Sequence, residues 1–302
     1  MLLLFYLICF VCLAFQYSSS DYIQCTTQCT QITVAFDDSL AIPRECADTN
    51  GVTRAFDSAL VCIIDYRIDY DAERIYVNFK ASNDTTYLDG LKQSQSLVQT
   101  LWLGFSEESQ QPNITHRKYE CKTGDDCARA FYLSTIERLT TSGKVQLDHI
   151  HSKLYNRSLS MSRLSRRRCT DSSKMGNRTS VRCGTGLCYA HHLNYEANER
   201  DHVKKQHCSS DLTPTLFSEI QHHLPESDVI ERELIEYRCN KNVCNRIEMI
   251  EEIKRILYEY TSWNVAKSVE TAIITTKSST GRQTSVSLGL LLLSFIGHRF
   301  LF

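Results

Sequence analysis

The residues best suited to chemistry in this 302-residue chain are its 14 cysteines. Two of them, Cys9 and Cys12, lie in an apolar N-terminal run. The others are even in number and contain no C-x-x-C pair of the kind found in zinc sites, so we expect disulfide bonds and no metal. They fall into two equal groups on either side of a basic stretch: Cys25, Cys29, Cys46, Cys62, Cys121 and Cys127, then Cys169, Cys183, Cys188, Cys208, Cys239 and Cys244.

Histidines and carboxylates offer weaker chemical signals. Histidines gather in the second half of the chain: His191, His192, His202, His207, His222 and His223. Neighbouring histidines on a strand point in opposite directions, so we expect surface histidines and not a metal centre. The acid pairs Glu107–Glu108 and Asp125–Asp126 could act as general acid and base, but no known catalytic motif accompanies them. We interpret them as solvated loop charges and predict no enzyme and no cofactor.

The two ends of the chain predict secretion and a membrane anchor. The apolar run over 2–15, followed by small residues, is typical of a signal peptide covering 1–20, with an uncleaved anchor as the alternative. Near the other end, 286–297 is apolar but short for about 30 Å of hydrocarbon. We therefore predict a glycosylphosphatidylinositol (GPI) attachment signal over 280–302. Ser279 is the expected attachment site and Ser278 the alternative; a short transmembrane helix or a soluble tail would be the other outcomes.

Composition is typical of globular extracellular domains. The apolar content of 42% and the charged content of 23% are ordinary, and the length suggests about two domains. The net charge of −1 lacks the basic excess of nucleic-acid binders, so we expect no nucleic-acid partner. Four N-glycosylation sequons are expected on exposed loops: Asn83, Asn113, Asn156 and Asn177.

The two halves of the chain are similar in sequence. YECKTGDDCARAFYLSTIERL at 119–139 matches YRCNKNVCNRIEMIEEIKRIL at 237–257. We interpret the match as an internal repeat made by duplication, in which Cys46 corresponds to Cys169; chance similarity is the alternative. The predicted organisation is a disulfide-rich domain over 21–157, a basic linker that also fits a protease-processing site over 158–168, a second such domain over 169–262 and a Ser/Thr-rich stalk over 263–279.

Apolar periodicity predicts both strands and helices. Strands are expected over 31–36, 61–66 and 74–79, and either a strand or a short buried helix over 97–105. Apolar residues at helical spacing predict amphipathic helices over 250–260 and 132–139, and 228–237 is also predicted to be helical. The expected fold class is a small disulfide-rich α+β protein, with β-hairpin cores and added amphipathic helices.

The second half ends in Cys239-Asn-Lys-Asn-Val-Cys244-Asn245. This motif, with the order of the preceding cysteine gaps, resembles the three-finger superfamily of snake toxins, lymphocyte-antigen-type surface proteins and urokinase-receptor domains. The resemblance implies three loops on a disulfide knot braced by Asn245, with the pairs Cys169–Cys188, Cys183–Cys208 and Cys239–Cys244. The chain departs from the family pattern, because a further common disulfide is missing, 211–238 is long and looks helical, and an amphipathic segment follows Asn245.

These features predict a non-enzymatic, GPI-anchored glycoprotein on the outer leaflet of the plasma membrane. Loops between fixed cysteines can vary without disturbing the disulfide core, which suits recognition. The expected partner is an extracellular protein ligand or a membrane receptor, which the protein would bind or modulate. The alternatives are a secreted enzyme or inhibitor with an unrecognised site, and a structural surface-coat protein that self-associates.

Overall fold

The computed structural model describes residues 22–27, 32–38, 40, 56–86, 88, 94–105, 113–155, 167–173, 180–184, 186–195, 203–224 and 230–261. Several predictions lie outside these residues: the signal peptide, the stalk, the GPI signal with Ser278 and Ser279, Cys29, Cys46, Glu107, Glu108, Asn156, Asn177 and His202. Among the described residues, no helix has the length and apolar character needed to cross a membrane.

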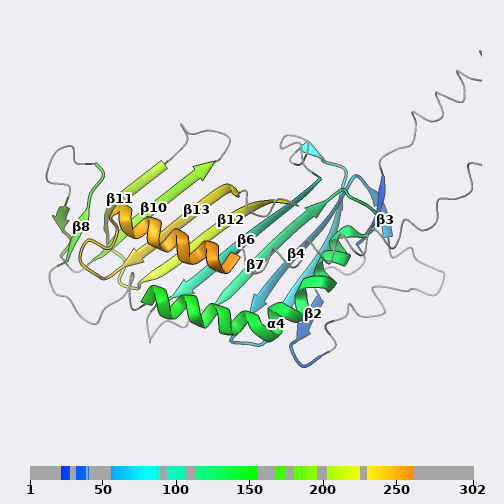
Figure 1. The fold of residues 1–302 in the computed structure, drawn as a ribbon, viewed down its shortest axis with the longest axis horizontal. Helices are drawn as coiled ribbons and strands as arrows, with labels where there is room; N and C mark the ends of the chain where they lie inside the picture. The colour runs from blue at the N-terminus through cyan, green and yellow to red at the C-terminus, as the bar shows by residue number, and fades with distance from the viewer. Residues whose placement is uncertain are drawn as a thin grey trace, which may run out of the picture.

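Strands from both halves of the chain form one nine-stranded antiparallel sheet (Figure 1). Its order is β11-β10-β13-β12-β6-β7-β4-β5-β2. The first half supplies β2 (Ile32–Ala35), β4 (Val61–Asp69), β5 (Arg74–Ser82), β6 (Gln95–Gly104) and β7 (Ile114–Cys121). The second half supplies β10 (Leu187–Tyr195), β11 (Val203–Ser209), β12 (Thr215–Leu224) and β13 (Ile230–Cys239). Two smaller antiparallel pairs join β1 (Ile23–Thr26) to β3 (Phe56–Ala59) and β8 (Arg168–Thr170) to β9 (Ser180–Arg182).

The two halves meet where β6 pairs with β12. This pairing is antiparallel and runs from Thr215 opposite Gly104 to Leu224 opposite Gln95. On either side of this seam the strand order is the same, because β7 pairs with β4 as β13 pairs with β10, and β5 and β11 follow. The boundaries at 21–157 and 169–262 stay a prediction, but the halves share a continuous sheet, and residue 168 already begins β8.

Two helices cover the same face of the sheet (Figure 1). They are α4 (Cys127–Leu154) and a helix over residues 247–261. Their apolar faces are buried against the sheet, including Tyr132, Ile136 and Leu139 in α4 and Ile250 and Ile253 in the other helix. The helical periodicity over 132–139 and 250–260 therefore gave correct predictions. Lys153 Nζ lies 3.0 Å from Glu259 Oε2 and links the two helices.

The prediction of a helix over 228–237 was wrong, because this segment forms most of β13. Its glutamates and Leu234 suit a helix, yet burial alternates along it, with Glu233, Ile235 and Tyr237 facing the helices. Pairing with β10 on one side and β12 on the other overrides local propensity. The ambiguous segment 97–105 is strand β6 for the same reason, and the three other predicted strands are confirmed as β2, β4 and β5.

Candidate functional site on the open face of the sheet

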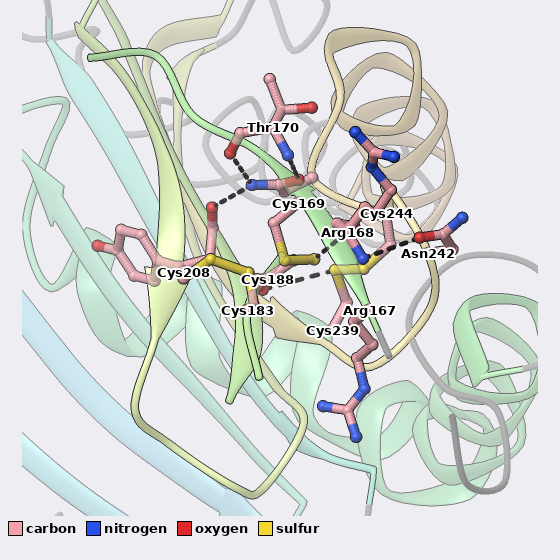
Figure 2. Close-up of a disulfide and its surroundings, with 12 residues drawn as sticks. Arg167, Arg168, Cys169, Thr170, Cys183, Cys188, Cys208, Cys239, Asn242 and Cys244 are labelled. Carbon is pink, nitrogen blue, oxygen red and sulfur yellow. Dashed lines mark hydrogen bonds between the residues drawn. A yellow bond between two sulfur atoms is a disulfide. The ribbon is translucent and has the colours of Figure 1, made fainter. Parts of the chain in front are cut away.

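Disulfides fix one end of each of the strands β4, β7, β10 and β13. The described bonds are Cys25–Cys62, Cys121–Cys127, Cys169–Cys188, Cys183–Cys208 and Cys239–Cys244. The last three, drawn in Figure 2, are the pairs that the three-finger resemblance implies. Cys62 lies opposite Cys121 in the sheet, just as Cys188 lies opposite Cys239. By this geometry Cys25, and not Cys46, occupies the position equivalent to Cys169, which corrects the alignment of the halves.

Asn245 braces the second-half disulfides from a fully buried position. Its Nδ2 donates hydrogen bonds to the carbonyl oxygens of Thr170 and Tyr189, both at 2.9 Å. Its Oδ1 accepts a hydrogen bond from Thr170 N at 2.8 Å. Close by, Asn242 Oδ1 accepts one from Arg168 N at 2.9 Å (Figure 2). These side chains satisfy backbone groups that β8 leaves unpaired, so they hold β8 against the sheet.

The acid pair Asp125–Asp126 has the same task in the first half. Asp125 Oδ1 accepts a hydrogen bond from Gln24 N at 2.9 Å, and Asp126 Oδ1 accepts one from Thr26 N at 3.0 Å. Both residues lie in the turn before α4, and Asp125 is exposed, as the interpretation as loop charges predicts; in addition they bind the backbone of β1. The signal that could have revealed their role is their position before Cys127, which matches Asn242 and its neighbour before Cys244.

The side of the sheet opposite the two helices carries polar and aromatic side chains; we call it the open face. In the first half these side chains line a depression of about 460 Å³. It is lined by Thr33, Asp65, Arg67, Tyr76, Asn78 and His116. Strand register brings them together, because Arg67 lies opposite Tyr76 on one side and opposite His116 on the other. The Arg67 guanidinium carbon is 4.5 Å from the centre of the Tyr76 ring.

Asp65 is the electrostatic centre of this depression. Its carboxylate contacts His116 Nε2 and lies 3.7 Å from Lys80 Nζ. The hydrogen bond with His116 and the nearby positive charges hold the pKa of Asp65 below its ordinary value, although burial acts in the opposite direction. Asp65 is therefore a negatively charged carboxylate at neutral pH. Together with Lys80 it gives this part of the open face both negative and positive charge.

A second cluster of aromatic and charged side chains lies on the open face of the other half. The Tyr189 ring is 4.5 Å from the His207 ring, and the Arg238 guanidinium carbon is 5.4 Å from the Tyr189 ring centre. Glu236 lies 3.3 Å from Arg238 Nη1 and 3.6 Å from His191 Nδ1. Glu236 thus contacts a cationic side chain on its own strand, Arg238, and His191 on the neighbouring strand β10.

Two aromatic rings occupy the seam between the clusters. Trp102 on β6 lies opposite Phe217 on β12, with ring centres 5.8 Å apart in an edge-to-face arrangement. Trp102 remains 48% exposed. Large apolar side chains are normally removed from water, so a half-exposed tryptophan next to a second aromatic ring, on the middle strand of the sheet, marks a candidate contact point. No single residue pattern in the sequence signalled this site, because it needs strands from both halves.

The predicted group of histidines divides between the two sides of the sheet. His191 and His207 lie on the open face, whereas His192 faces the helices and lies 3.7 Å from Glu233 Oε2. His222 is also buried, so the expectation of surface histidines was wrong for His192 and His222, and the side chain of His223 lies outside the described residues. Among the described residues, one group of three potential metal ligands lies close together, Cys169, Cys183 and Cys208, and all three form disulfides.

Two of the four sequons are described, and both lie beyond strand ends. Asn83 follows β5 and is exposed, and Asn113 precedes β7 and is half-buried. The Asn113 backbone N–H donates to Asp71 Oδ2 at 3.1 Å. Glycans at these positions would extend from strand ends and not from the middle of the open face.

No family model, no curated protein and no solved structure matches this chain. The described residues define a disulfide-rich, mostly β protein with two helices on one face of its sheet. Its function must therefore be argued from its own surfaces and from its sequence.

Proposed function

We propose that this protein is a GPI-anchored cell-surface binding protein that engages an extracellular protein partner through the open face, without catalysis. The observation that carries the proposal is Trp102, 48% exposed beside Phe217 at the seam between two charged clusters. Tryptophan, tyrosine and arginine are the residues most enriched at energetic centres of protein interfaces. Arg67 and Tyr76 stand on strands on one side of β6, and Tyr189 stands on a strand on the other side.

The rigidity of the open face supports this proposal. Trp102 and Phe217 stand on β6 and β12, which are hydrogen-bonded between β7 and β13, and each of these flanking strands is tied at one end by a disulfide. Little side-chain or loop ordering would therefore be needed on binding. Charged groups on the face are already paired, as between Lys118 and Glu120 at 2.6 Å. Paired charges around an aromatic centre give specificity and orientation more than affinity.

We also infer that the second half is a three-finger module and that the first half is its duplicate. The second half contains three hairpins, β8-β9, β10-β11 and β12-β13, with β13 returning to pair with β10. The implied disulfide pairs and the buried Asn245 support this assignment. The first half pairs β1 with β3, β4 with β5 and β6 with β7 in the same order.

The membrane anchor rests on the sequence of the C-terminus. The proposal places the described part outside the cell, connected to the lipid at Ser279 through the Ser/Thr-rich stalk. It predicts that phosphatidylinositol-specific phospholipase C releases the protein from the surface of cells that express the full chain. A surface pool that resists the enzyme, while a known GPI-anchored protein on the same cells is released, would contradict the anchor.

The binding surface is tested with a secreted form of the chain, tetramerised and applied to a panel of cells. We expect Trp102→Ala to reduce cell binding at least tenfold, whereas Leu133→Ala, which removes an equally exposed side chain (43%) from α4, leaves it unchanged. Both variants should secrete and melt like the parent. Equal binding by the parent and Trp102→Ala would exclude the seam as the contact point, and binding lost equally in both variants would contradict the choice of face.

A further inference from the structure

A buried arginine lies between the sheet and the helices, close to the seam of the two halves. Arg117 on β7 is 0% exposed. Its Nη2 donates a hydrogen bond of 2.6 Å to Gln99 Oε1, and Gln99 Nε2 donates in turn to the carbonyl oxygen of Thr261 at 3.4 Å. Arg117 Nε and Nη1 have no hydrogen-bond partner. Among the described residues, no carboxylate forms an ion pair with this guanidinium.

Buried tyrosine hydroxyl groups lie near Arg117. The Tyr70 hydroxyl is buried and also lacks a hydrogen-bond partner. The Tyr260 hydroxyl lies 3.2 Å from Thr115 Oγ1. Burial, reinforced by Tyr260, holds the pKa of Tyr70 well above its ordinary value, even though the positive charge of Arg117 acts to lower it. Tyr70 is therefore a neutral phenol and does not serve as the counter-ion of Arg117.

Elsewhere in the same layer the fold does provide partners for a buried charge. Glu233 on β13 is fully buried, and its Oε2 lies 2.7 Å from the Tyr258 hydroxyl and 3.2 Å from Lys254 Nζ. An unpaired buried charge is strongly destabilising, whereas a partnered one is tolerated. Arg117 therefore differs from Glu233 in needing a negative charge that the described residues do not supply.

We propose that the interior around Arg117 binds one small monovalent anion, held by the guanidinium N–H groups and the Tyr70 hydroxyl. The chemistry required is a single negative charge that accepts N–H and O–H donors, which a halide or the carboxylate of a small organic acid provides. The site needs both halves, because Arg117 and Tyr70 come from the first and Tyr260 and Thr261 from the second. A bound anion would thus stabilise the contact of the helix over 247–261 with the first-half strands.

The test measures the melting temperature of the purified full-length chain against the concentration of sodium bromide or sodium acetate. Ionic strength is held constant with a bulky sulfonate salt. We expect a saturable rise of several degrees, because a ligand that binds only the folded state stabilises it by mass action. Arg117→Met should remove the rise. Arg246→Met, which removes an arginine from an exposed surface pair, should retain it.

The two salts show which kind of anion binds. A rise in melting temperature with bromide alone indicates a halide site, and a rise with acetate alone indicates a carboxylate site. If an organic acid remains bound through purification, neither salt will raise the melting temperature, because the site is already filled. In that case a mass spectrum of the denatured wild-type protein should show the released acid, and that of Arg117→Met should not. If Arg117→Met does not fold, Tyr70→Phe replaces it and should raise the half-saturating concentration several-fold. Flat curves with no released acid, or the same response in wild type and the variant, would overturn the proposal.

Discussion

The two halves close the same turn with different chemistry. In the first half Asp126 has a positive φ of 52° and its N–H donates to Gln24 O at 2.6 Å. In the second half Val243 has a φ of 54° and its N–H donates to Arg168 O at 2.7 Å. The acceptors that tie down the first strand are carboxylates in one half and the side-chain amides of Asn242 and Asn245 in the other. Backbone geometry is thus kept while the side chains that hold it are exchanged.

The interiors of the halves differ more than their turns. Counted back from the cysteines that end β7 and β13, Arg117 in the first half takes the place of Ile235 in the second. The second half places its buried charge two residues earlier, at Glu233, and surrounds it with Lys254 and Tyr258. One scaffold therefore holds buried charges of opposite sign: Glu233 has an ionic partner, whereas Arg117 has none among the described residues. The difference shows that strand order and disulfides leave the polarity of the interior free to vary.

The largest expected effect comes from the disulfide that joins the first strand of each half to the sheet. Cys25–Cys62 spans 37 residues and Cys169–Cys188 spans 19. In the chain-entropy account, removing the first should cost about 4 kcal/mol and removing the second about 3 kcal/mol. Urea unfolding of the two paired Cys→Ala variants measures both losses. A larger loss in the second half would show that loop entropy does not dominate.

The buried charges should respond to neutralisation with opposite sign. Glu233→Gln leaves Lys254 without its carboxylate and should lower the free energy of unfolding by about 3 kcal/mol. Arg117→Met, measured in a buffer free of small anions, should be neutral or stabilising, because it removes a buried charge that has no ionic partner. Chemical denaturation at pH 7 compares the variants. If Glu233→Gln and Arg117→Met destabilise the protein equally, the two buried charges do not differ in how well they are compensated.

The stability that the Glu233 carboxylate contributes should also depend on pH. Burial raises the pKa of Glu233, but the combined effect of His192, Tyr258 and Lys254, which lower it, is larger. The pKa therefore lies below its ordinary value. A carboxyl whose folded pKa is depressed contributes stability above its unfolded pKa, about 4.3, and loses it as pH falls through the folded pKa. The stability gap between wild type and Glu233→Gln should therefore close below about pH 4. A gap that persists at acid pH would exclude the charge as its cause.

A smaller effect should follow from adding a methyl group at Gly143, which packs closely against Tyr70. Gly143 lies as far beyond Cys127 as Tyr260 lies beyond Cys244, so the helices place their smallest and one of their largest side chains at matching positions. A Cβ at Gly143 would lie 2.3 Å from the Tyr70 hydroxyl oxygen. Gly143→Ala should destabilise the chain by about 2 kcal/mol through overpacking. Tyr70→Phe in the same background removes the clashing oxygen and should restore most of the loss in thermal melts.

The smallest expected effect tests the exchange of carboxylate for amide in the closing turn. Asp126→Ala removes the acceptor for Thr26 N and should cost about 1 kcal/mol. Asp126→Asn keeps a side-chain acceptor, as Asn245 does in the second half, and it is tolerated at positive φ, so it should be close to neutral. Thermal unfolding of the two variants provides the measurement. A loss in Asp126→Asn equal to that in Asp126→Ala would mean that the charge itself is needed.

Prediction from sequence succeeded where one local pattern decided the structure. Alternation over 61–66 and 74–79 gave β4 and β5, and helical spacing over 250–260 gave the helix that crosses the seam. It failed at β13, whose glutamates and Leu234 suit a helix, and it missed the hydrogen bonds of Asp125 and Asp126, which depend on a strand about 100 residues away. The open-face site could not be predicted, because Trp102 and Phe217 are brought together only by the seam.

The sequence alone determined the elements whose causes are local: the period of apolar residues in strands and helices, and the supply of cysteines for a cross-linked core. The tertiary structure decided what depends on pairing between distant segments. It joined β6 to β12 and so merged two similar halves into a single sheet. It also placed Arg117 in a closed interior, because the burial of a side chain is set by everything that packs over its strand and not by its neighbours in sequence.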